Sequence, residues 1–313
     1  MELAQQIIDR NPTALGQGIT LLESTLPEHE EQSQKLLSEC LPHSGKSIRI
    51  GVTGVPGVGK STFIEAFGKL LTSKGKKVAV LAIDPTSEKT YGSILGDKSR
   101  MHELAADENA FIRPSPSGGT LGGVANKTRE SIILCEAAGF DIILIETVGV
   151  GQSETTASNL VDFFLLLMLA GAGDELQGIK RGIMELADAL IITKADRDNL
   201  QEAKNAALEY KRALHLFPPM ENGWKPQVST CSALENRGID KICDTITSYD
   251  SQMNASGWKM KNREKQNNYF LHQRIKEELG RKKYKSLLSD GKLQLLEKEF
   301  KEGKTIYQIF SSI

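Results

Sequence analysis

A glycine-rich segment with one lysine and one serine carries the clearest chemical signal in this sequence. Residues 50–62 read IGVTGVPGVGKST and place Gly54, Gly59, Lys60 and Ser61 at the spacing GxxxxGK[ST], between a β-rich run and a helical pattern. Glycines let successive backbone N–H groups converge on phosphate oxygens, and a helix N-terminus adds a positive dipole. We therefore expect Lys60 to bridge the β- and γ-phosphates of a nucleotide and the Ser61 hydroxyl to bind Mg²⁺. The residues assigned to the nucleotide by this motif are Gly54, Val55, Pro56, Gly57, Val58, Gly59, Lys60, Ser61 and Thr62.

A second polar segment predicts which base the nucleotide carries. The run ALIITKAD ends with Thr193, Lys194 and Asp196, which is the form of the [NT]KxD guanine-reading element. An Asp carboxylate accepts hydrogen bonds from the ring N–H and the exocyclic amine of guanine, whereas adenine offers an acceptor and a C–H there. Because unpaired buried polar groups are costly, one carboxylate discriminates strongly, and the Lys194 stem would stack along the base. Thr193 stands where asparagine is commoner, which could alter base affinity. Downstream, STCSALEN resembles the second base-contacting loop and supplies Ser232, Ala233 and Leu234.

Three carboxylates are candidates for the metal site. Asp84 ends the hydrophobic run VAVLAID, Asp97 lies in GSILGDKSR, and Glu146 ends DIILIE. Mg²⁺ needs a near-octahedral shell of oxygen ligands, usually several waters with one or two carboxylates. We expect Glu146 to act as the Walker-B-type residue, directly or through water. A helix cap or a surface charge is the alternative interpretation of Asp84 and Asp97.

Several further residues could act on the γ-phosphate. Gly149, in TVGVGQSE, could offer its N–H to this group and make the segment a switch that senses hydrolysis. Gln152 could position the attacking water, although a surface glutamine at the start of a helix fits equally well. Arg113 is a basic group able to approach phosphate. The loop 118–123 is equally consistent with a flexible connector.

The elements that must position these residues are alternating strands and helices. Such alternation implies right-handed crossovers and a mainly parallel sheet, with ligands at the carboxyl ends of its strands. The fold class predicted is α/β, a P-loop NTPase domain with a mainly parallel central sheet flanked by helices, plus helical extensions at both ends. The boundaries are 1–44 for the N-terminal extension, 45–253 for the P-loop domain and 254–313 for the C-terminal helical arm. The predicted strands are SIRIGVT, KKVAVLAID, FDIILIET, DFFLLLML, ADALIIT and PQVST.

Composition excludes several classes of protein. The 313 residues carry a net charge of −1, which argues against a nucleic-acid binder with a broad basic face. The most apolar stretch, residues 163–173, is too short to span a bilayer and suits a buried strand. The N-terminus lacks the order of a signal peptide, and the four cysteines show no metal-ligand spacing. We expect a cytoplasmic protein that binds neither nucleic acid nor membrane.

Taken together, the chain resembles the methylmalonyl-CoA mutase-associated G-protein chaperones, the MeaB/ArgK family of SIMIBI-class P-loop GTPases. The resemblance covers nearly the whole chain and includes GVPGVGKST, AIDPTS, YGSILGDKSRM, FIRPSPSGGTLGG, IETVGVGQSE and AGAGDELQGIKRGIMELAD. By its residues alone, the segment 170–185 is a solvated charged loop. The resemblance implies instead an additional switch that couples nucleotide state to a partner enzyme, and it adds Lys180 to the catalytic candidates Lys60, Glu146 and Gln152. The segment also contains Asp174, Glu175, Gln177 and Arg181.

The resemblance also implies partners and a reaction. The client would be an adenosylcobalamin-dependent acyl-CoA mutase. The GTPase would gate the loading of cofactor into this mutase and protect it from inactivation; an adenosyltransferase is a second candidate partner. GTP would be hydrolysed to GDP and phosphate, slowly alone and faster with the partner. A homodimer would form through the C-terminal arm. The apolar stripe in this arm could be either the dimer contact or the arm's own core, and it consists of Leu287, Leu288, Leu293, Leu295 and Leu296.

Two alternatives come from other functional classes. One is an ATPase or kinase serving amino-acid transport, which the TKAD element disfavours. The other is a metallochaperone GTPase, which usually carries a His-rich tract or a CxxC-type site. The five histidines of this chain are scattered and form neither.

Overall fold

The computed structural model describes residues 2–83, 101–113, 121–147, 153–171, 181–310 and 313. Contacts group the chain into two compact units, each of which is described by itself. The helical unit comprises Met1–Ser47, Asn126–Gly139 and Lys259–Ile313. The sheet unit comprises Ile48–Ala125 and Phe140–Trp258. The predicted three-part division into 1–44, 45–253 and 254–313 stays a prediction.

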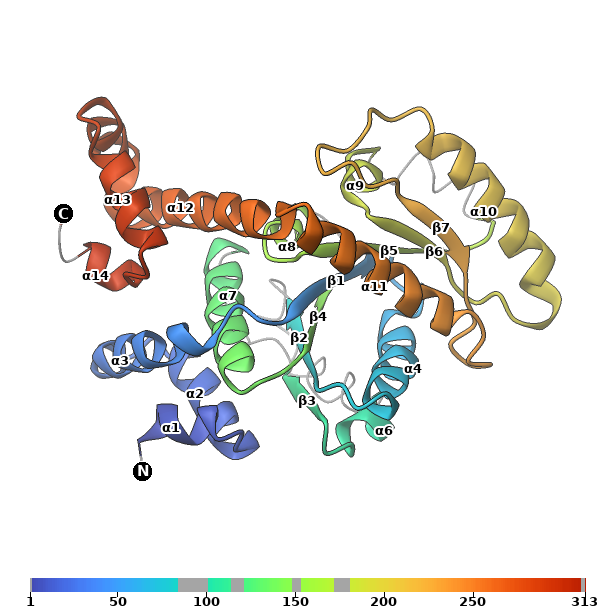
Figure 1. Ribbon diagram of the computed structural model, residues 1–313, viewed down its shortest axis with the longest axis horizontal. Helices are drawn as coiled ribbons and strands as arrows, with labels where there is room; N and C mark the ends of the chain where they lie inside the picture. The colour runs from blue at the N-terminus through green and yellow to red at the C-terminus, as the bar shows by residue number, and fades with distance from the viewer. Residues whose placement is uncertain (1, 84–100, 114–120, 148–152, 172–180, 311–312) are drawn as a thin grey trace. The chain divides into compact units, whose positions relative to one another are not determined.

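The sheet unit is built on seven parallel strands (Figure 1). Their order across the sheet is β3-β2-β4-β1-β5-β6-β7, so that β1 lies between β4 and β5. The predicted α/β fold with a parallel sheet is therefore confirmed. The strands are β1 (Ile48–Gly54), β2 (Val78–Ile83), β3 (Ala110–Arg113), β4 (Ile142–Thr147), β5 (Phe163–Met168), β6 (Ala189–Ile192) and β7 (Gln227–Thr230).

One of these strands, β3, was not predicted from the sequence. It has only four residues, AFIR, too few to show a clear period, and they are all half-buried. Its pairing with β2, from Val78 opposite Ala110 to Leu81 opposite Arg113, gives it an extended partner that is distant in sequence. Strand formation here depends on that pairing rather than on local pattern.

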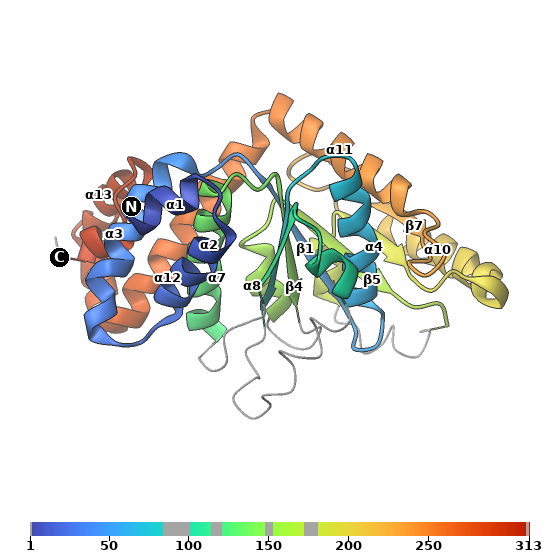
Figure 2. The same cartoon turned by 90° about the horizontal axis from the view of Figure 1, so that it is seen from below.

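Helices α4 (Lys60–Ser73) and α11 (Ile239–Ala255) pack together over one face of the sheet (Figure 2). Phe63 and Phe67 of α4 stack with ring centroids 5.5 Å apart and join a core that includes Ile50, Val52 and Phe163. Helix α8 (Ser153–Ser158) contacts β4 and β1, and α10 (Leu200–Leu214) packs on β6 and β7. The unit is completed by α6 (His102–Ala105), α9 (Arg181–Leu186) and the 3₁₀ turn η5 (Arg197–Asn199).

The central strands are buried on both faces, which explains their continuous apolar runs. Every residue of β5, FFLLLM, is buried, as is every residue of β4. A parallel sheet covered on both sides favours such runs over alternation. The first six residues of the apolar stretch 163–173 thus form a core strand. Among the described residues, none of the helices combines the length and apolar character needed to cross a membrane.

The helical unit contains α1 (Leu3–Ile8), α2 (Pro12–Glu23), α3 (Glu30–Cys40), most of α7 (Leu121–Ala137), nearly all of α12 (Trp258–Ser289), α13 (Lys292–Lys301) and α14 (Ile306–Phe310). Short 3₁₀ turns lie at Pro27–His29 and Leu41–His43. Helix α2 begins with proline, and the Asn11 side chain accepts hydrogen bonds from the backbone N–H groups of Thr13 and Ala14. Helix α12 is broken at Gly280, where φ is 75°.

The leucine stripe of the C-terminal arm divides between two environments. Leu287, Leu293 and Leu296 are buried with Phe270 and other apolar residues of α12 and α14, so they form part of the arm's own core. Leu288 and Leu295, in contrast, expose 59% and 57% of their surface. Only these last two are available for contact with another molecule.

A buried ion pair fixes the segment that precedes β1. The guanidinium of Arg263 donates to the carbonyls of Gly45 at 2.8 Å and Ser47 at 2.7 Å, and it lies 3.6 Å from the Glu136 carboxylate. Glu136 in turn accepts from the Gly45 N–H and the Ser47 hydroxyl at 2.8 and 2.7 Å. Each charge therefore has several partners, which is the condition for tolerating burial. Within the helical unit, this network joins α7 and α12 to the residues that lie just before β1.

A buried carboxyl group at the amino end of β6 should make stability depend on pH. Burial raises the pKa of Asp188 to about 7, with a further contribution from Asp162, although the Phe164 N–H donates to Asp188 at 2.8 Å and opposes the shift. Because the folded carboxyl holds its proton more tightly than the unfolded one, the unfolding free energy should fall as pH rises from about 4 to about 7. The loss would be about 4 kcal/mol at most.

Replacing Asp188 with asparagine should remove this dependence, and urea unfolding at pH 5 and pH 8 measures it. We expect Asp188→Asn to be the more stable protein at pH 8 and to gain little at pH 5. Asp198→Asn, at an exposed position, is the matched control and should keep the wild-type pH dependence. An unchanged pH dependence in Asp188→Asn would contradict the assignment.

Candidate functional site

The P-loop leaves β1 at Gly54 and enters α4 after Gly59. Gly54 has φ of 151°, and a Cβ there would lie 2.5 Å from the carbonyl oxygen of Leu167 on β5, so a side chain does not fit. Gly59 has φ of 95° and is the N-cap of α4, a left-handed conformation that favours glycine. These two glycines turn the chain tightly enough to place the N-terminus of α4 at the carboxyl end of β1.

Lys60, Ser61 and Glu146 meet at this end of the sheet. The Lys60 ammonium donates to the Gly54 carbonyl at 2.9 Å and lies 3.4 Å from that of Val55, so it is held over the loop. The Ser61 hydroxyl donates to Glu146 Oε1 at 3.2 Å, and both residues are buried. Register places Glu146 of β4 opposite Val52 of β1. A hydroxyl and a carboxylate so close together form a hard-oxygen donor set that fits Mg²⁺.

The TKAD element is hydrogen-bonded to the P-loop through two side chains. The buried Thr193 hydroxyl is 2.7 Å from the Val58 carbonyl and 3.2 Å from that of Met168, so the shorter contact takes its single proton. Lys194 has φ of 54°, and its ammonium donates to the Gly57 carbonyl at 2.7 Å. Threonine thus supplies a donor to the P-loop at the position where asparagine is commoner.

We expect Thr193→Val to weaken nucleotide binding by about fivefold to about 150-fold, because it leaves the Val58 carbonyl without this donor at a cost of about 1–3 kcal/mol. Fluorescence titration with mant-GDP measures the change. Thr193→Ser keeps the hydroxyl and is the control that should bind nearly as the wild type does. Equal affinity of the valine variant would show that this hydrogen bond does not support the loop.

The loop predicted to contact the base follows β7 and closes on itself. The backbones of Ser232 and Arg237 exchange two hydrogen bonds of 3.0 Å, and the Ser232 hydroxyl accepts from the Glu235 N–H at 3.1 Å. Between them, Ala233 is half-buried and Leu234 is 77% exposed. The loop therefore presents an apolar side chain and backbone groups near TKAD.

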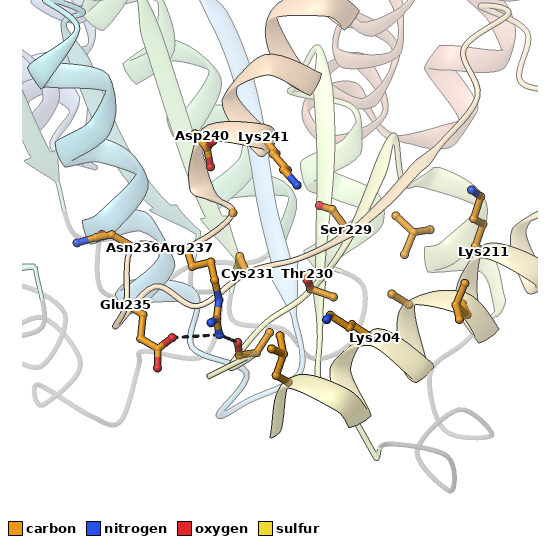
Figure 3. Close-up of a pocket in the computed structure, with 16 residues that line it drawn as sticks. Lys204, Lys211, Ser229, Thr230, Cys231, Glu235, Asn236, Arg237, Asp240 and Lys241 are labelled. Carbon is orange, nitrogen blue, oxygen red and sulfur yellow. Dashed lines mark hydrogen bonds and ion pairs between the residues drawn. The ribbon is translucent and has the colours of Figure 1, made fainter. Parts of the chain in front are cut away.

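A pocket of about 1040 Å³ lies beside this loop, between α10, β7 and the start of α11 (Figure 3). Its polar lining includes Lys204, Lys211, Arg237 and Lys241. Cys231 also lines it, and burial raises the pKa of this thiol to about 12, so it stays protonated. Of the predicted TKAD residues and their neighbours, Ala195 reaches this pocket.

The structure thus brings together most of the predicted site residues, while others lie outside the described part of the chain. Asp84, Asp97, Gly149, Gln152 and Lys180 belong to that second group, as do Asp174, Glu175 and Gln177. Arg113 is described and ends β3, where it pairs in register with Leu81. Within the described ranges, no group of three or more His, Cys, Asp or Glu side chains could hold a metal ion.

Two residues near the base-reading elements were missed by the sequence analysis. The Asn199 side chain donates to the Lys194 carbonyl at 2.8 Å, and the Arg237 guanidinium donates to the Ala195 carbonyl. Both act on main-chain carbonyls, so no residue pattern marks them. Only the folded arrangement of the two loops reveals these contacts.

Comparisons with known proteins identify the family to which this chain belongs. The family model described as methylmalonyl Co-A mutase-associated GTPase MeaB matches residues 15–286. The chain is 51% identical to GTPase ArgK of Escherichia coli K12 over 265 residues, which cover 85% of this chain and 80% of that protein. It is 47% identical over 291 residues to a Mus musculus protein named methylmalonic aciduria type A homolog, mitochondrial, covering 87% of this chain and 70% of the relative.

A solved structure extends the similarity to the whole chain. A crystal structure described as LAO/AO transport system kinase is 38% identical, with a TM-score of 0.78, and the match covers 99% of this chain and 95% of that one. The fold, the P-loop and the relatives named as GTPases all indicate a GTPase. The chain is a P-loop GTPase that belongs to the methylmalonyl-CoA mutase-associated GTPase MeaB family.

Proposed function

We propose that this protein is a GTP-binding and GTP-hydrolysing chaperone that gates adenosylcobalamin loading and protects an acyl-CoA mutase of the methylmalonyl-CoA mutase type. The observation that carries the proposal is the match of residues 15–286 to a family described as mutase-associated GTPases. The hydrogen-bonded cluster of P-loop, TKAD and second loop supports its nucleotide-binding part.

Each side chain of the described site has a role in this proposal. Lys60 bridges the β- and γ-phosphates, and backbone N–H groups of the P-loop surround them. Asp196 accepts hydrogen bonds from guanine, with Lys194 along the base and residues 232–234 on its other side. Ser61 and Glu146 would hold Mg²⁺, directly or through water. When bound, this ion neutralises charge that develops on the phosphate oxygens.

Roles for residues outside the described part of the chain remain part of the proposal. Asp84 and Asp97 would help to hold Mg²⁺, and Gly149 would offer its N–H to the γ-phosphate. Gln152 positions the attacking water, and Lys180 belongs to the switch that reports nucleotide state to the mutase. Hydrolysis would be slow without a partner, because in many GTPases a residue of the partner completes the catalytic site.

Measuring GTP turnover by the purified protein tests whether the mutase is its partner. It should be measured alone and with the cobalamin-dependent mutase from the same organism, and again with an adenosyltransferase added. We expect the mutase to accelerate GTP hydrolysis and the GTPase to prolong mutase activity during turnover. GTP hydrolysis that is unchanged by the mutase, with no protection of the mutase, would refute the chaperone role.

The same assay separates this proposal from its main alternative, an ATPase or kinase linked to amino-acid transport. The description of the solved relative as a transport system kinase favours that alternative. We expect acceleration with GTP and none with ATP, because TKAD presents a carboxylate that adenine cannot satisfy. Preferential ATP turnover would support the kinase class.

We propose a homodimer in which the exposed leucines Leu288 and Leu295 take part in the contact. Leu288→Glu with Leu295→Glu should shift the mass found by sedimentation equilibrium from a dimer towards the 34.3 kDa of one chain. Leu208→Glu is the control, since Leu208 is 56% exposed on α10 outside this arm. A dimer that survives the double substitution would exclude these residues from the interface.

The cysteines favour a cytoplasmic location. Cys40, Cys135, Cys231 and Cys243 are all free and buried. Free thiols without disulfides are typical of a reducing compartment. This supports the proposed location alongside the proposed intracellular client.

A further inference from the structure

We propose that Arg237 is a positioning residue for guanine recognition, which holds the segment carrying Asp196 and the loop carrying residues 232–234 at a fixed separation. The inference rests on the proposed role of Asp196 in reading the base. Arg237 belongs to neither motif by sequence. Its contacts nevertheless join the two motifs across the carboxyl ends of β6 and β7.

The guanidinium of Arg237 contacts both sides of this junction. It donates to the carbonyl of Ala195, the residue between Lys194 and Asp196, and it pairs with Glu235 of its own loop at 3.0 Å (Figure 3). Both contacts are made by one guanidinium nitrogen, Nη2, which carries two N–H groups. Arg237 therefore ties the base-reading segment to the second loop.

Backbone hydrogen bonds make this connection rigid on the loop side. Arg237 donates its N–H to the Ser232 carbonyl and accepts from the Ser232 N–H, both at 3.0 Å. Glu235 is held as well, because its N–H donates to the Ser232 hydroxyl at 3.1 Å. The guanidinium is thus anchored at the base of the loop that presents Ala233 and Leu234.

The other side of the junction needs such support. Ala195 donates its N–H to the Cys231 carbonyl at 3.0 Å, so both of its main-chain polar groups bond to the second loop. Its neighbour Lys194 has φ of 54°, a conformation uncommon outside glycine, and Asn199 bonds to the Lys194 carbonyl. A strained conformation persists when the surrounding structure over-determines it. The Arg237 contact is one of the constraints on this segment, and Asp196 is the residue that follows Ala195.

The ion pair with Glu235 is the lesser part of this arrangement. The two side chains are 46% and 36% exposed, and exposed ion pairs contribute little. The hydrogen bond from a charged donor to the Ala195 carbonyl is the stronger contact. Since a base-reading carboxylate must be held within about 0.5 Å of its productive position, losing this bond should loosen discrimination rather than phosphate binding.

Arg237→Met, which keeps much of the stem and removes every donor, tests the inference. We expect the affinity for mant-GDP to fall about tenfold, a loss typical of one charged hydrogen bond. KM for GTP should rise while kcat stays within about twofold, because the phosphates are held by the P-loop. The preference for GTP over ITP, which lacks the exocyclic amine, should shrink. Arg237→Lys should recover part of both losses.

Lys241→Met is the matched control, because Lys241 lines the same pocket and carries the same charge. It should leave the affinity for mant-GDP and the GTP-to-ITP preference unchanged. Equal losses in both variants would show a general effect of charge and overturn the inference. An Arg237→Met protein that is less stable but keeps the wild-type GTP-to-ITP preference would also overturn the inference.

The Asp196→Asn variant separates failure of this inference from failure of the proposed function. If Asp196→Asn keeps full guanine selectivity, the base-reading assignment itself fails, whatever Arg237→Met shows. If Asp196→Asn loses that selectivity and Arg237→Met does not change it, only the positioning role of Arg237 is refuted.

Discussion

Lys60→Ala is expected to abolish measurable GTP turnover and to weaken nucleotide binding strongly. In the proposed site the lysine ammonium lies against the phosphates, and in the structure it is held over the loop by the Gly54 carbonyl. Removing one preorganised electrostatic group of this kind typically costs about 10²- to 10³-fold in kcat. Phosphate release under saturating GTP measures turnover, and mant-GDP titration measures binding.

The control for this variant is Lys76→Ala, an exposed lysine just beyond the end of α4. It removes the same charge from the sheet unit and should leave both measurements near the wild type. The melting temperature of Lys60→Ala should also stay close to that of the wild type, since Lys60 is only half-buried. Near-normal GTP hydrolysis by Lys60→Ala would refute the assignment of the phosphate loop.

Asp196→Asn should move nucleotide preference from GTP towards XTP by about 10²-fold or more, a size typical of sites that read a base through hydrogen bonds. The carboxylate accepts from two donors on guanine. The amide can accept from the ring N–H and can donate to the additional carbonyl of xanthine, but it places a donor against the exocyclic amine of guanine. Competition of GTP, XTP and ATP against mant-GDP measures the change.

Asp198→Asn, two residues further along, is the control for this experiment because it makes the same chemical change at an exposed position. It should keep the wild-type order of affinities. If GTP remained preferred in Asp196→Asn, another group would have to read the base. The P-loop assignment would be unaffected, since Lys60 and Ser61 act on the phosphates.

Much of the fold follows from local sequence. Six of the seven strands correspond to runs rich in apolar or β-branched residues that stand out from the helical pattern around them. The phosphate loop is also local, because Gly54, Gly59, Lys60 and Ser61 lie within a short stretch that runs from the end of β1 into the start of α4. Motifs of this kind can be recognised because a short stretch of backbone determines their geometry.

The short strand β3 shows that local pattern does not predict every strand. Its four residues gain their extended conformation by pairing with β2. The leucine stripe shows the same limit, since helical spacing cannot distinguish Leu287, which is buried, from Leu288, which is 59% exposed. Tertiary packing separates two neighbours of the same residue type.

The sequence alone determined the P-loop motif and the parallel sheet and predicted a guanine-reading motif, because each depends on a local pattern of residue types. Only the tertiary structure placed Glu146 at 3.2 Å from Ser61 and Thr193 at 2.7 Å from the Val58 carbonyl. The contact of Arg237 with Ala195 likewise depends on two loops distant in sequence. Strand order and register decide such contacts, and they are set by the packing of the whole sheet rather than by any one segment.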